Sequence, residues 1–247
     1  MDLIVSGNTD IGRKRSTNQD SYYLGHATKL FIVADGMGGH NGGDIASQMA
    51  VRDLPEFVKN HLQMEPTQLL KAAIADTNNS IKKYGEKHAE LAGMGTTVVC
   101  FFFKGQNLYI GNVGDSRAYL INQQRIFQLS SDHSLVQEKL NLGVYTREQA
   151  ALDSQRNILV RTVGFESDVE IDVFVYKVNK NDLFLSCSDG LHGKVSDEDI
   201  VYIINKHIPD PSNATQSNLD KAVLELIAQA NENGGQDNIT AILVAAQ

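Results

Sequence analysis

The sequence predicts an α+β fold in which two antiparallel β-sheets pack against each other and a helix pair flanks each outer face, an α-β-β-α sandwich. Three observations lead to it. The chain has 247 residues, 42% of them hydrophobic, which is enough for one domain with a large core. Short runs of β-branched and aromatic residues, separated by tight polar turns, are typical of consecutive hairpins. Segments with helical periodicity occur as one early pair and one late pair, which suits a layered arrangement.

The strand signals start with the apolar run 31–34 and dominate the middle of the chain. Later strands are expected at 96–103, 107–113, 116–121, 125–129, 170–178, 182–188 and 239–246. Polar residues at 104–107 and 122–124 suggest hairpin turns between neighbouring strands. Because these runs follow one another closely, we expect mostly antiparallel pairing.

The helix signals bracket the strands. Apolar residues recur at helical spacing over 44–62, 67–87, 196–206 and 219–231. Pro55 predicts a kink or break in the first of these, and Pro66 marks the start of the second. Ser196 is an N-cap candidate, and Gly234 a stop signal for the last helix. The polar stretch 209–217 is expected to be a surface loop.

The net charge and the composition disfavour several classes of binding partner. The formal net charge is −8, which disfavours nucleic-acid binding through phosphate neutralisation and leaves no basic patch for anionic lipid. No apolar run approaches the roughly 18 residues that a membrane span needs. Cys100 and Cys187 lie inside apolar runs, as buried cysteines of a reducing compartment do. We therefore expect a soluble, cytoplasmic protein, a monomer without nucleic-acid or membrane partners, whose residues 1–247 form a single domain.

Aspartates beside glycine occur at the ends of predicted strands, far apart in sequence; they are Asp35, Asp115, Asp189 and Asp237. Several converging carboxylates repel each other unless a cation neutralises them, and carboxylates are the ligands that hard divalent ions prefer. Asp35 can bridge two ions, and Gly36 can offer its carbonyl oxygen. The pattern predicts a carboxylate-rich metal site assembled by a sheet.

Two further segments contain residue types that bind phosphate in other proteins. The glycine-rich segment 35–43 follows a strand, but Asn41 stands where a dinucleotide fingerprint needs glycine, and no Gly-Lys-Ser/Thr follows, so nucleotide binding is disfavoured. Arg15 precedes Asp20 by five residues, and an arginine suits bidentate capture of phosphate. Taken alone, the charged run 12–20 fits a solvated surface loop better.

Six motifs in one order resemble the signature set of the protein phosphatase 2C family of metal-dependent phosphatases, in its compact bacterial form. They are Arg15-x-x-Asn18-Gln19-Asp20, Ala34-Asp35-Gly36-Met37-Gly38-Gly39-His40, Gly95-Thr96-Thr97, Gly111-Asn112-Val113-Gly114-Asp115-Ser116-Arg117, Ser188-Asp189-Gly190-Leu191 and Gly235-Gln236-Asp237-Asn238-Ile239-Thr240. The resemblance covers nearly the whole chain. It implies hydrolysis of phosphoserine and phosphothreonine in proteins, opposite a cytoplasmic serine/threonine kinase, by a water activated between two Mn²⁺ or Mg²⁺ ions, with a possible weaker third ion.

The resemblance also implies a role for each matching residue. Asp35 would bridge two ions, with Gly36 donating its carbonyl to one, while Asp189 and Asp237 would hold the other. Asp115, with Asp189, would bind the weaker third ion. Arg15 would bind the phosphate group. Asp20 would lie near the second ion and contact it through the waters of that ion. Asn238 would lie beside the reactive water.

This chain departs from the family pattern at two positions. Gln19 stands where many members have glutamate, so weaker affinity is expected at the second ion. Met37 stands where animal members have a histidine thought to protonate the leaving group, as is common in bacterial members. His40 is the nearest alternative acid by sequence, although a local helix-start role suits it better.

The segment 141–164 resembles the mobile flap of bacterial members, and flaps gate access to a site. Arg156 and Arg161 in it would either hold a phosphopeptide or face solvent. Two rival functions stay open: a non-catalytic, regulatory or binding module of the same family, and a calcium-binding module. The retained Arg15, Asp35, Asp189 and Asp237 argue against the first, and the lack of an EF-hand loop spacing argues against the second.

Overall fold

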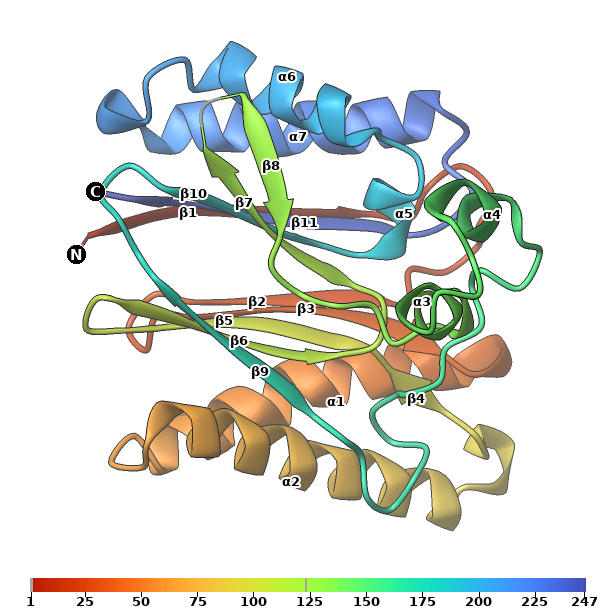
Figure 1. Cartoon of the computed structure of the whole chain (residues 1–247). Helices are drawn as coiled ribbons and strands as arrows, with labels where there is room; N and C mark the ends of the chain where they lie inside the picture. Colours follow the sequence, from red (N-terminus) through yellow and green to blue (C-terminus); the bar gives the residue numbers. More distant parts are fainter. Residues whose placement is uncertain (1, 123) are drawn as a thin grey trace.

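Four layers make up the chain: two helices, two stacked β-sheets and two further helices (Figure 1). The computed structural model describes residues 2–122 and 124–247. The arrangement confirms the α-β-β-α sandwich expected from the sequence. The predicted turn at 122–124 includes Gln123, which lies outside the described residues, although Asn122 and Arg125 on either side of it pair as expected.

Among the described residues, neighbouring strands in both sheets pair antiparallel. The first sheet has the order β1 (Leu3–Asp10), β11 (Ile239–Ala246), β10 (Leu183–Cys187), β7 (Arg117–Asn122) and β8 (Arg125–Gln128). The second has the order β2 (Asp20–Gly25), β3 (Leu30–Met37), β5 (Val98–Lys104), β6 (Asn107–Val113) and β9 (Asp172–Lys177), with β4 (Gly95–Thr96) pairing the end of β3. The first and last strands of the chain, β1 and β11, lie side by side.

The long helices cover the outer faces of the sheets (Figure 1). Helices α1 (Gly39–Asn60) and α2 (Pro66–Lys87) cover the second sheet, and α6 (Asp197–His207) and α7 (Gln216–Glu232) cover the first. Three short helices lie elsewhere: α3 (Leu135–Asn141), α4 (Arg147–Leu152) and α5 (Asp189–His192). Ser196 caps α6 as expected, since its side chain accepts a hydrogen bond from the Asp199 amide.

Strand alternation divides the apolar residues among three cores. In β11 the odd-numbered residues from Ile239 to Ala245 face α6 and α7, where they join one core cluster. Ile242 and Val244 face the other sheet and pack in the cluster between the sheets. The inter-sheet core is aromatic, with ring centroids of Phe103 and Phe184 5.7 Å apart. Each sheet is therefore buried on both faces, which explains why its central strands are apolar throughout.

Several boundaries differ from the expectations. Strands β1 and β2 were not predicted because both are sheet edges in which most residues are only partly buried, so their apolar alternation is weak. Helix α1 begins at Gly39, five residues before the predicted start at 44, and it continues through Pro55 without a break. The predicted loop 209–217 contains a short 3₁₀ turn, Pro211–Asn213, and the first residues of α7. Cys100 and Cys187 are free and buried, as expected. Among the described residues, no helix has the length and apolar character of a membrane span.

Candidate active site

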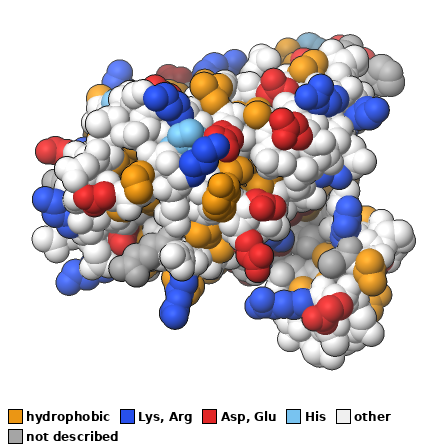
Figure 2. Space-filling model, turned by 90° about the horizontal axis from the view of Figure 1, so that it is seen from above, with side chains coloured by type: hydrophobic (Ala, Val, Ile, Leu, Met, Phe, Trp, Pro, Cys, Tyr) orange, Lys and Arg blue, Asp and Glu red, His pale blue; other side chains and the backbone are white. Residues whose placement is uncertain are grey.

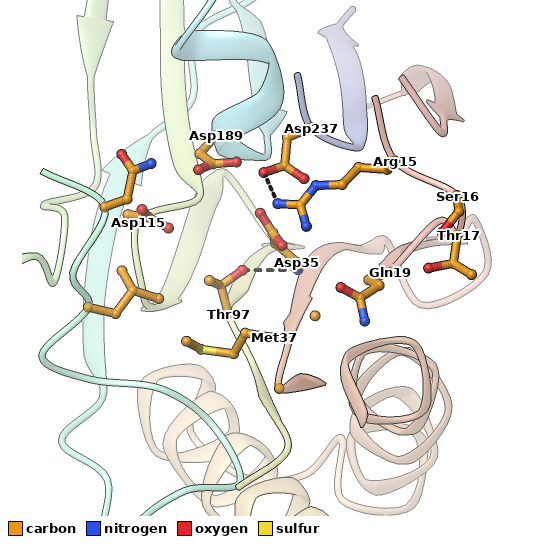
Figure 3. A pocket seen from close by; sticks show the side chains of 14 residues that line it. Arg15, Ser16, Thr17, Gln19, Asp35, Met37, Thr97, Asp115, Asp189 and Asp237 are labelled. Carbon is orange, nitrogen blue, oxygen red and sulfur yellow. Dashed lines mark hydrogen bonds and ion pairs between the residues drawn. The ribbon is translucent and has the colours of Figure 1, made fainter. Parts of the chain in front are cut away.

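A cavity of about 630 Å³ opens at one end of the sandwich, where loops from both sheets meet. Its lining brings together four of the predicted acidic residues, Asp35, Asp115, Asp189 and Asp237, with Arg15. Figure 3 shows Asp35, Asp189, Asp237 and Arg15 pointing toward one another, with Asp115 farther to the side. Residues separated by up to 222 positions thus share one hollow. Gly36, Met37 and Gln19 line it as well.

Asp35 lies within β3, two residues before the strand ends, and a threonine fixes its backbone. The Asp35 amide donates to the Thr97 hydroxyl at 3.0 Å, and the Thr97 amide donates to the Asp35 carbonyl at 2.8 Å. The neighbouring Gly36 packs so tightly against α1 that an added Cβ would lie 1.9 Å from the carbonyl oxygen of Gly43. Only glycine fits there, so β3 and the start of α1 hold Asp35 in place from two sides.

Asp189 and Asp237 lie next to strands of the first sheet, Asp189 two residues after β10 and Asp237 two residues before β11. Asp189 is the first residue of α5, where the N-terminal end of a helix favours a carboxylate only weakly because α5 has a single turn. Its Oδ1 is buried without a hydrogen-bond partner among the described residues. Asp237 accepts a hydrogen bond from the Arg15 guanidinium, with Nη2 and Oδ2 2.7 Å apart (Figure 3). One cation of the chain thus already lies against the carboxylate cluster.

Asp20 and Asn238 do not line the cavity; they lie behind it. Asp20 is 6% exposed, and its Oδ2 accepts hydrogen bonds from the hydroxyls of Ser188 at 2.7 Å and Thr240 at 2.6 Å. These contacts join the two sheets beside Asp189. Asn238 uses its side chain to hold the loop before β2, accepting from the Gln19 amide and donating to the carbonyl of Thr17. Its predicted place beside a reactive water stays a prediction.

Burial and mutual repulsion raise the pKa of Asp20, Asp35, Asp115 and Asp189. Desolvation is the largest cause for Asp35, followed by the charge of Asp20, and its pKa lies well above the ordinary value. Burial raises the pKa of Asp20 and of Asp115 to about 7 each. Burial and the Asp237 charge raise the pKa of Asp189. Ionising these buried, neighbouring carboxylates is therefore unfavourable in free energy, and a bound divalent cation would offset that unfavourable term.

The donor set fits divalent cations that prefer oxygen. The lining supplies carboxylates and the backbone of Gly36, and the buried, unpartnered Oδ1 of Asp189 lacks a positive partner. Among residues 2–122 and 124–247, no three His, Cys, Asp or Glu side chains are grouped closely enough to form a full ligand set for one ion. Oxygen ligands of this kind suit Mn²⁺ and Mg²⁺ alike.

Sequence reasoning missed several residues of the cavity: Ser16, Thr17, Thr97, Asn157 and Leu159. Thr97 belongs to the motif Gly95-Thr96-Thr97. Its hydrogen bonds to Asp35, however, depend on segments about 60 residues apart coming together, which the motif alone does not indicate. Arg156 is exposed and absent from the lining, while Asn157 beside it is present. The alternative acid His40 belongs to α1, and its side chain is outside what the structure describes.

The segment 141–164 projects beside this cavity. Seen from the α6–α7 side, it stands out as a lobe at the lower right, and a hollow separates it from the rest of the molecule (Figure 2). Leu142 and Leu152 in it are 78% and 88% exposed. The C-terminal part of the segment is anchored by two isolated β-bridges, one between Val163 and Thr96 and one between Leu159 and Ser134. The segment is thus anchored at its base and open at its tip.

Comparison with known proteins agrees with this geometry. The family model described as protein phosphatase 2C matches residues 10–243. The chain belongs to the protein phosphatase 2C (PP2C) family. Among similar curated PP2C proteins is the serine/threonine phosphatase stp of Listeria monocytogenes, 38% identical over 243 residues, which are 96% of this chain and 93% of that protein. The family resemblance inferred from the motifs is therefore confirmed.

Solved structures of the PP2C family superpose over almost the whole chain. The serine/threonine phosphatase PstP/Ppp of Mycobacterium tuberculosis has a TM-score of 0.89 at 32% identity and covers 99% of both chains. A PstP catalytic domain in complex with two manganese ions has a TM-score of 0.85 at 30% identity, with 98% of this chain and 97% of that chain covered. The layers of the present structure are thus those of PP2C phosphatases.

Proposed function

We propose that this PP2C protein hydrolyses phosphoserine and phosphothreonine esters in proteins, at two divalent ions, Mn²⁺ or Mg²⁺, held by Asp35, Gly36, Asp189 and Asp237. Asp115 would take a weaker third ion together with Asp189, and Asp20 would act behind them. We further propose that its substrates are phosphoproteins made by a serine/threonine kinase in the cytoplasm. The observation that carries the proposal is the presence of Arg15 and the carboxylate cluster on one cavity.

Arg15 gives the cavity its affinity for phosphate. Its guanidinium lies on Asp237 through Nη2, and the pKa of the group is raised by that hydrogen bond, so it stays charged. The planar fork of an arginine matches two oxygens of a phosphate, and a phosphate in the cavity would compete with Asp237 for it. Cations bound beside it would weaken the hold of Asp237 on Arg15, because they share the carboxylate's charge.

The carboxylates fix the position of the reaction. When divalent ions are bound, they lower the pKa of water and neutralise charge on phosphate oxygens. Asp35 stays rigid because Thr97 and Gly36 hold its backbone, and Asp20 stays rigid because two hydroxyls hold its carboxylate. No side-chain nucleophile is needed, and burial raises the pKa of the Cys187 thiol, which keeps it protonated and inert.

The flap proposed for residues 141–164 would add to substrate selection. Asn157 and Leu159 line the cavity from this segment, so a bound phosphopeptide would meet it. Arg156 at its exposed surface is the candidate contact for the peptide. We assign the whole of residues 1–247 to one catalytic domain acting as a monomer.

The deciding assay compares hydrolysis of p-nitrophenyl phosphate and of a phosphothreonine peptide with Mn²⁺ and with a chelator. We expect turnover of both with Mn²⁺ and none with the chelator. Phosphopeptide binding without turnover would favour the non-catalytic module, and calcium binding without either would favour the calcium module.

Replacing Arg15 by alanine should lower kcat/KM for p-nitrophenyl phosphate by about 10–100-fold, because hydrogen bonds to charged groups contribute about 1.5–3 kcal/mol. Tm should hardly change, since the Arg15–Asp237 pair is open to solvent. Lys14→Ala, an exposed neighbour outside the lining, is the matched control and should retain wild-type kinetics. Equal losses in the two variants would show that charge of the loop, rather than Arg15, binds phosphate.

Replacing Gln19 by glutamate should tighten the second ion. Gln19 lines the cavity, and its backbone carbonyl accepts a hydrogen bond from the Gly36 amide at 3.1 Å. A carboxylate on this residue would therefore belong to the segment that lies next to the proposed Gly36 ligand. Added negative charge among oxygen ligands strengthens binding of a hard cation. Calorimetric titration with Mg²⁺ should show a lower dissociation constant for Gln19→Glu than for wild type, and an unchanged constant would contradict the idea.

A further inference from the structure

The turn that carries Asp115 is gripped by a histidine on each side. His133 comes from the segment after β8, and its Nδ1 accepts a hydrogen bond from the Gly114 amide at 3.2 Å. His192 is the last residue of α5, and its Nε2 lies 3.0 Å from the carbonyl oxygen of Asp115. The two imidazoles thus contact the peptide groups on either side of the one that joins Gly114 to Asp115.

Other contacts hold the turn as well, including the hydrogen bond between the Thr97 and Ser116 hydroxyls at 2.8 Å. Gly114 has a φ of +106°, and an added Cβ would lie 2.6 Å from the Thr97 side chain, so the backbone is committed to a conformation that only glycine adopts easily. The His133 amide returns a hydrogen bond to the Gly114 carbonyl at 2.9 Å. His133 is 5% exposed, so water does not compete with these bonds.

The partners fix which nitrogen carries the proton in each ring. An amide can only donate, so Nδ1 of His133 accepts and the proton of the neutral ring is on Nε2, which lies 3.3 Å from the Asp172 carboxylate and 3.4 Å from Nη1 of Arg161. A carbonyl can only accept, so Nε2 of His192 carries the proton. Burial lowers the pKa of both rings, which keeps them neutral. Both histidines are thus neutral Nε2–H tautomers with fixed donor and acceptor ends.

We propose that His133 and His192 are positioning residues that fix the Asp115 carboxylate toward the cavity and so set the affinity of the weaker divalent-ion site there. The inference rests on the proposed function, in which Asp115 holds that ion. His192 belongs to the helix that begins at Asp189, so it connects Asp115 to Asp189, the two proposed ligands of one ion. His133 ties the same turn to β9 through Asp172.

Two matched pairs of variants separate positioning from packing. His192→Gln places an amide N–H where Nε2 stands, and His192→Met has similar length without a donor. His133→Asn places a carbonyl oxygen where Nδ1 stands, and His133→Leu has the same shape without an acceptor. The full chain is titrated with Mg²⁺ by calorimetry and with Mn²⁺ in the p-nitrophenyl phosphate assay, and Tm is measured for each variant.

We expect His192→Met and His133→Leu to weaken only the weaker site, by about 10–100-fold, as loss of partners behind metal ligands does. The affinity of the tight sites and KM for p-nitrophenyl phosphate should stay as in wild type. His192→Gln and His133→Asn should restore most of the lost affinity. In an Asp115→Ala background, the histidine variants should have no further effect on metal binding.

Other outcomes would overturn the inference: equal losses in both members of each pair, weakening of the tight sites, or an undiminished effect in the Asp115→Ala background. His192 is only partly buried, so its pair remains informative if His133→Leu does not fold. Wild type that binds Mg²⁺ with the expected variant pattern but does not hydrolyse the ester would refute the proposed function and leave the positioning role supported. Active wild type with unchanged metal affinities in all variants would refute the positioning role alone.

Discussion

Asp35→Asn should abolish most of the phosphatase activity while making the protein more stable when no divalent ion is present. Removing one preorganised charged group from an active site typically lowers kcat by about 10²–10³-fold, and Asp35 is the proposed bridge between two ions, so the loss should reach at least this range. Asparagine has the same shape, and the backbone bonds to Thr97 do not involve the changed atoms. The fold should therefore persist.

The stability gain follows from the same charge. The pKa of Asp35 is raised mainly by burial and then by Asp20 and Asp189, so its ionised form opposes folding at neutral pH. Asp35→Asn removes that opposition. We expect a higher Tm than wild type at pH 8 in a chelator and no difference below about pH 3, where both the folded and unfolded carboxyl groups are protonated.

A matched variant makes the result specific. Asp76→Asn removes an exposed carboxylate on α2, away from the cavity, and should leave activity and Tm close to wild type. Differential scanning calorimetry in chelator and the p-nitrophenyl phosphate assay in Mn²⁺ give the two readouts. Full activity in Asp35→Asn would contradict the proposed two-ion centre, and a lower Tm in chelator would contradict the account of the buried charge.

The same cluster shows what the sequence can and cannot predict. That Asp35, Asp189 and Asp237 would meet was predictable, since each stands within two residues of a glycine near the end of an apolar strand and an antiparallel sandwich gathers such ends. The order of layers was predictable for a similar reason, because the strands between two helix pairs leave few ways to bury every apolar face. The local sequence pattern was therefore enough to predict features that follow from a single physical cause, such as the burial of an apolar strand face.

Contacts across the fold were not predictable in this way. Asp20 depends on Ser188, 168 positions away, and hydroxyls at such separations leave no local mark. Helix α1 starts at Gly39 because Gly36 and Gly43 pack together, whereas local propensity places the start after the glycines. Strand β2 shows only Asp20 and Gly25 fully buried, so its period-2 pattern is hidden. Tertiary contacts determined each of these features.

A second large effect concerns pH and divalent ions together. The pKa values of Asp20 and Asp115 are raised to about 7 by burial, while unfolded aspartates titrate near 4. The folded protein thus binds more protons than the unfolded chain between about pH 4 and 7. Stability from these groups is fully present below pH 4 and is lost as the pH rises through 7. In a chelator, Tm should therefore fall as the pH rises from about 4 through 7, with the last part of the fall, above pH 6.5, lying above the ordinary pKa of histidine.

Mg²⁺ should reverse this fall, because ions bind the ionised carboxylates of the folded state and the unfolded chain offers no such cluster. At 100 times the dissociation constant, binding contributes about 2.7 kcal/mol, which corresponds to a rise in Tm of about 5–10 °C for a chain of this size. The rise should be larger at pH 8 than at pH 6.5, where protons compete for the ligands. Asp115→Asn should retain most of the rise, since Asp115 serves only the weaker site, whereas Asp189→Asn should lose most of it. A Tm rise independent of pH, or equal in the two variants, would mean that Mg²⁺ acts elsewhere than on this carboxylate cluster.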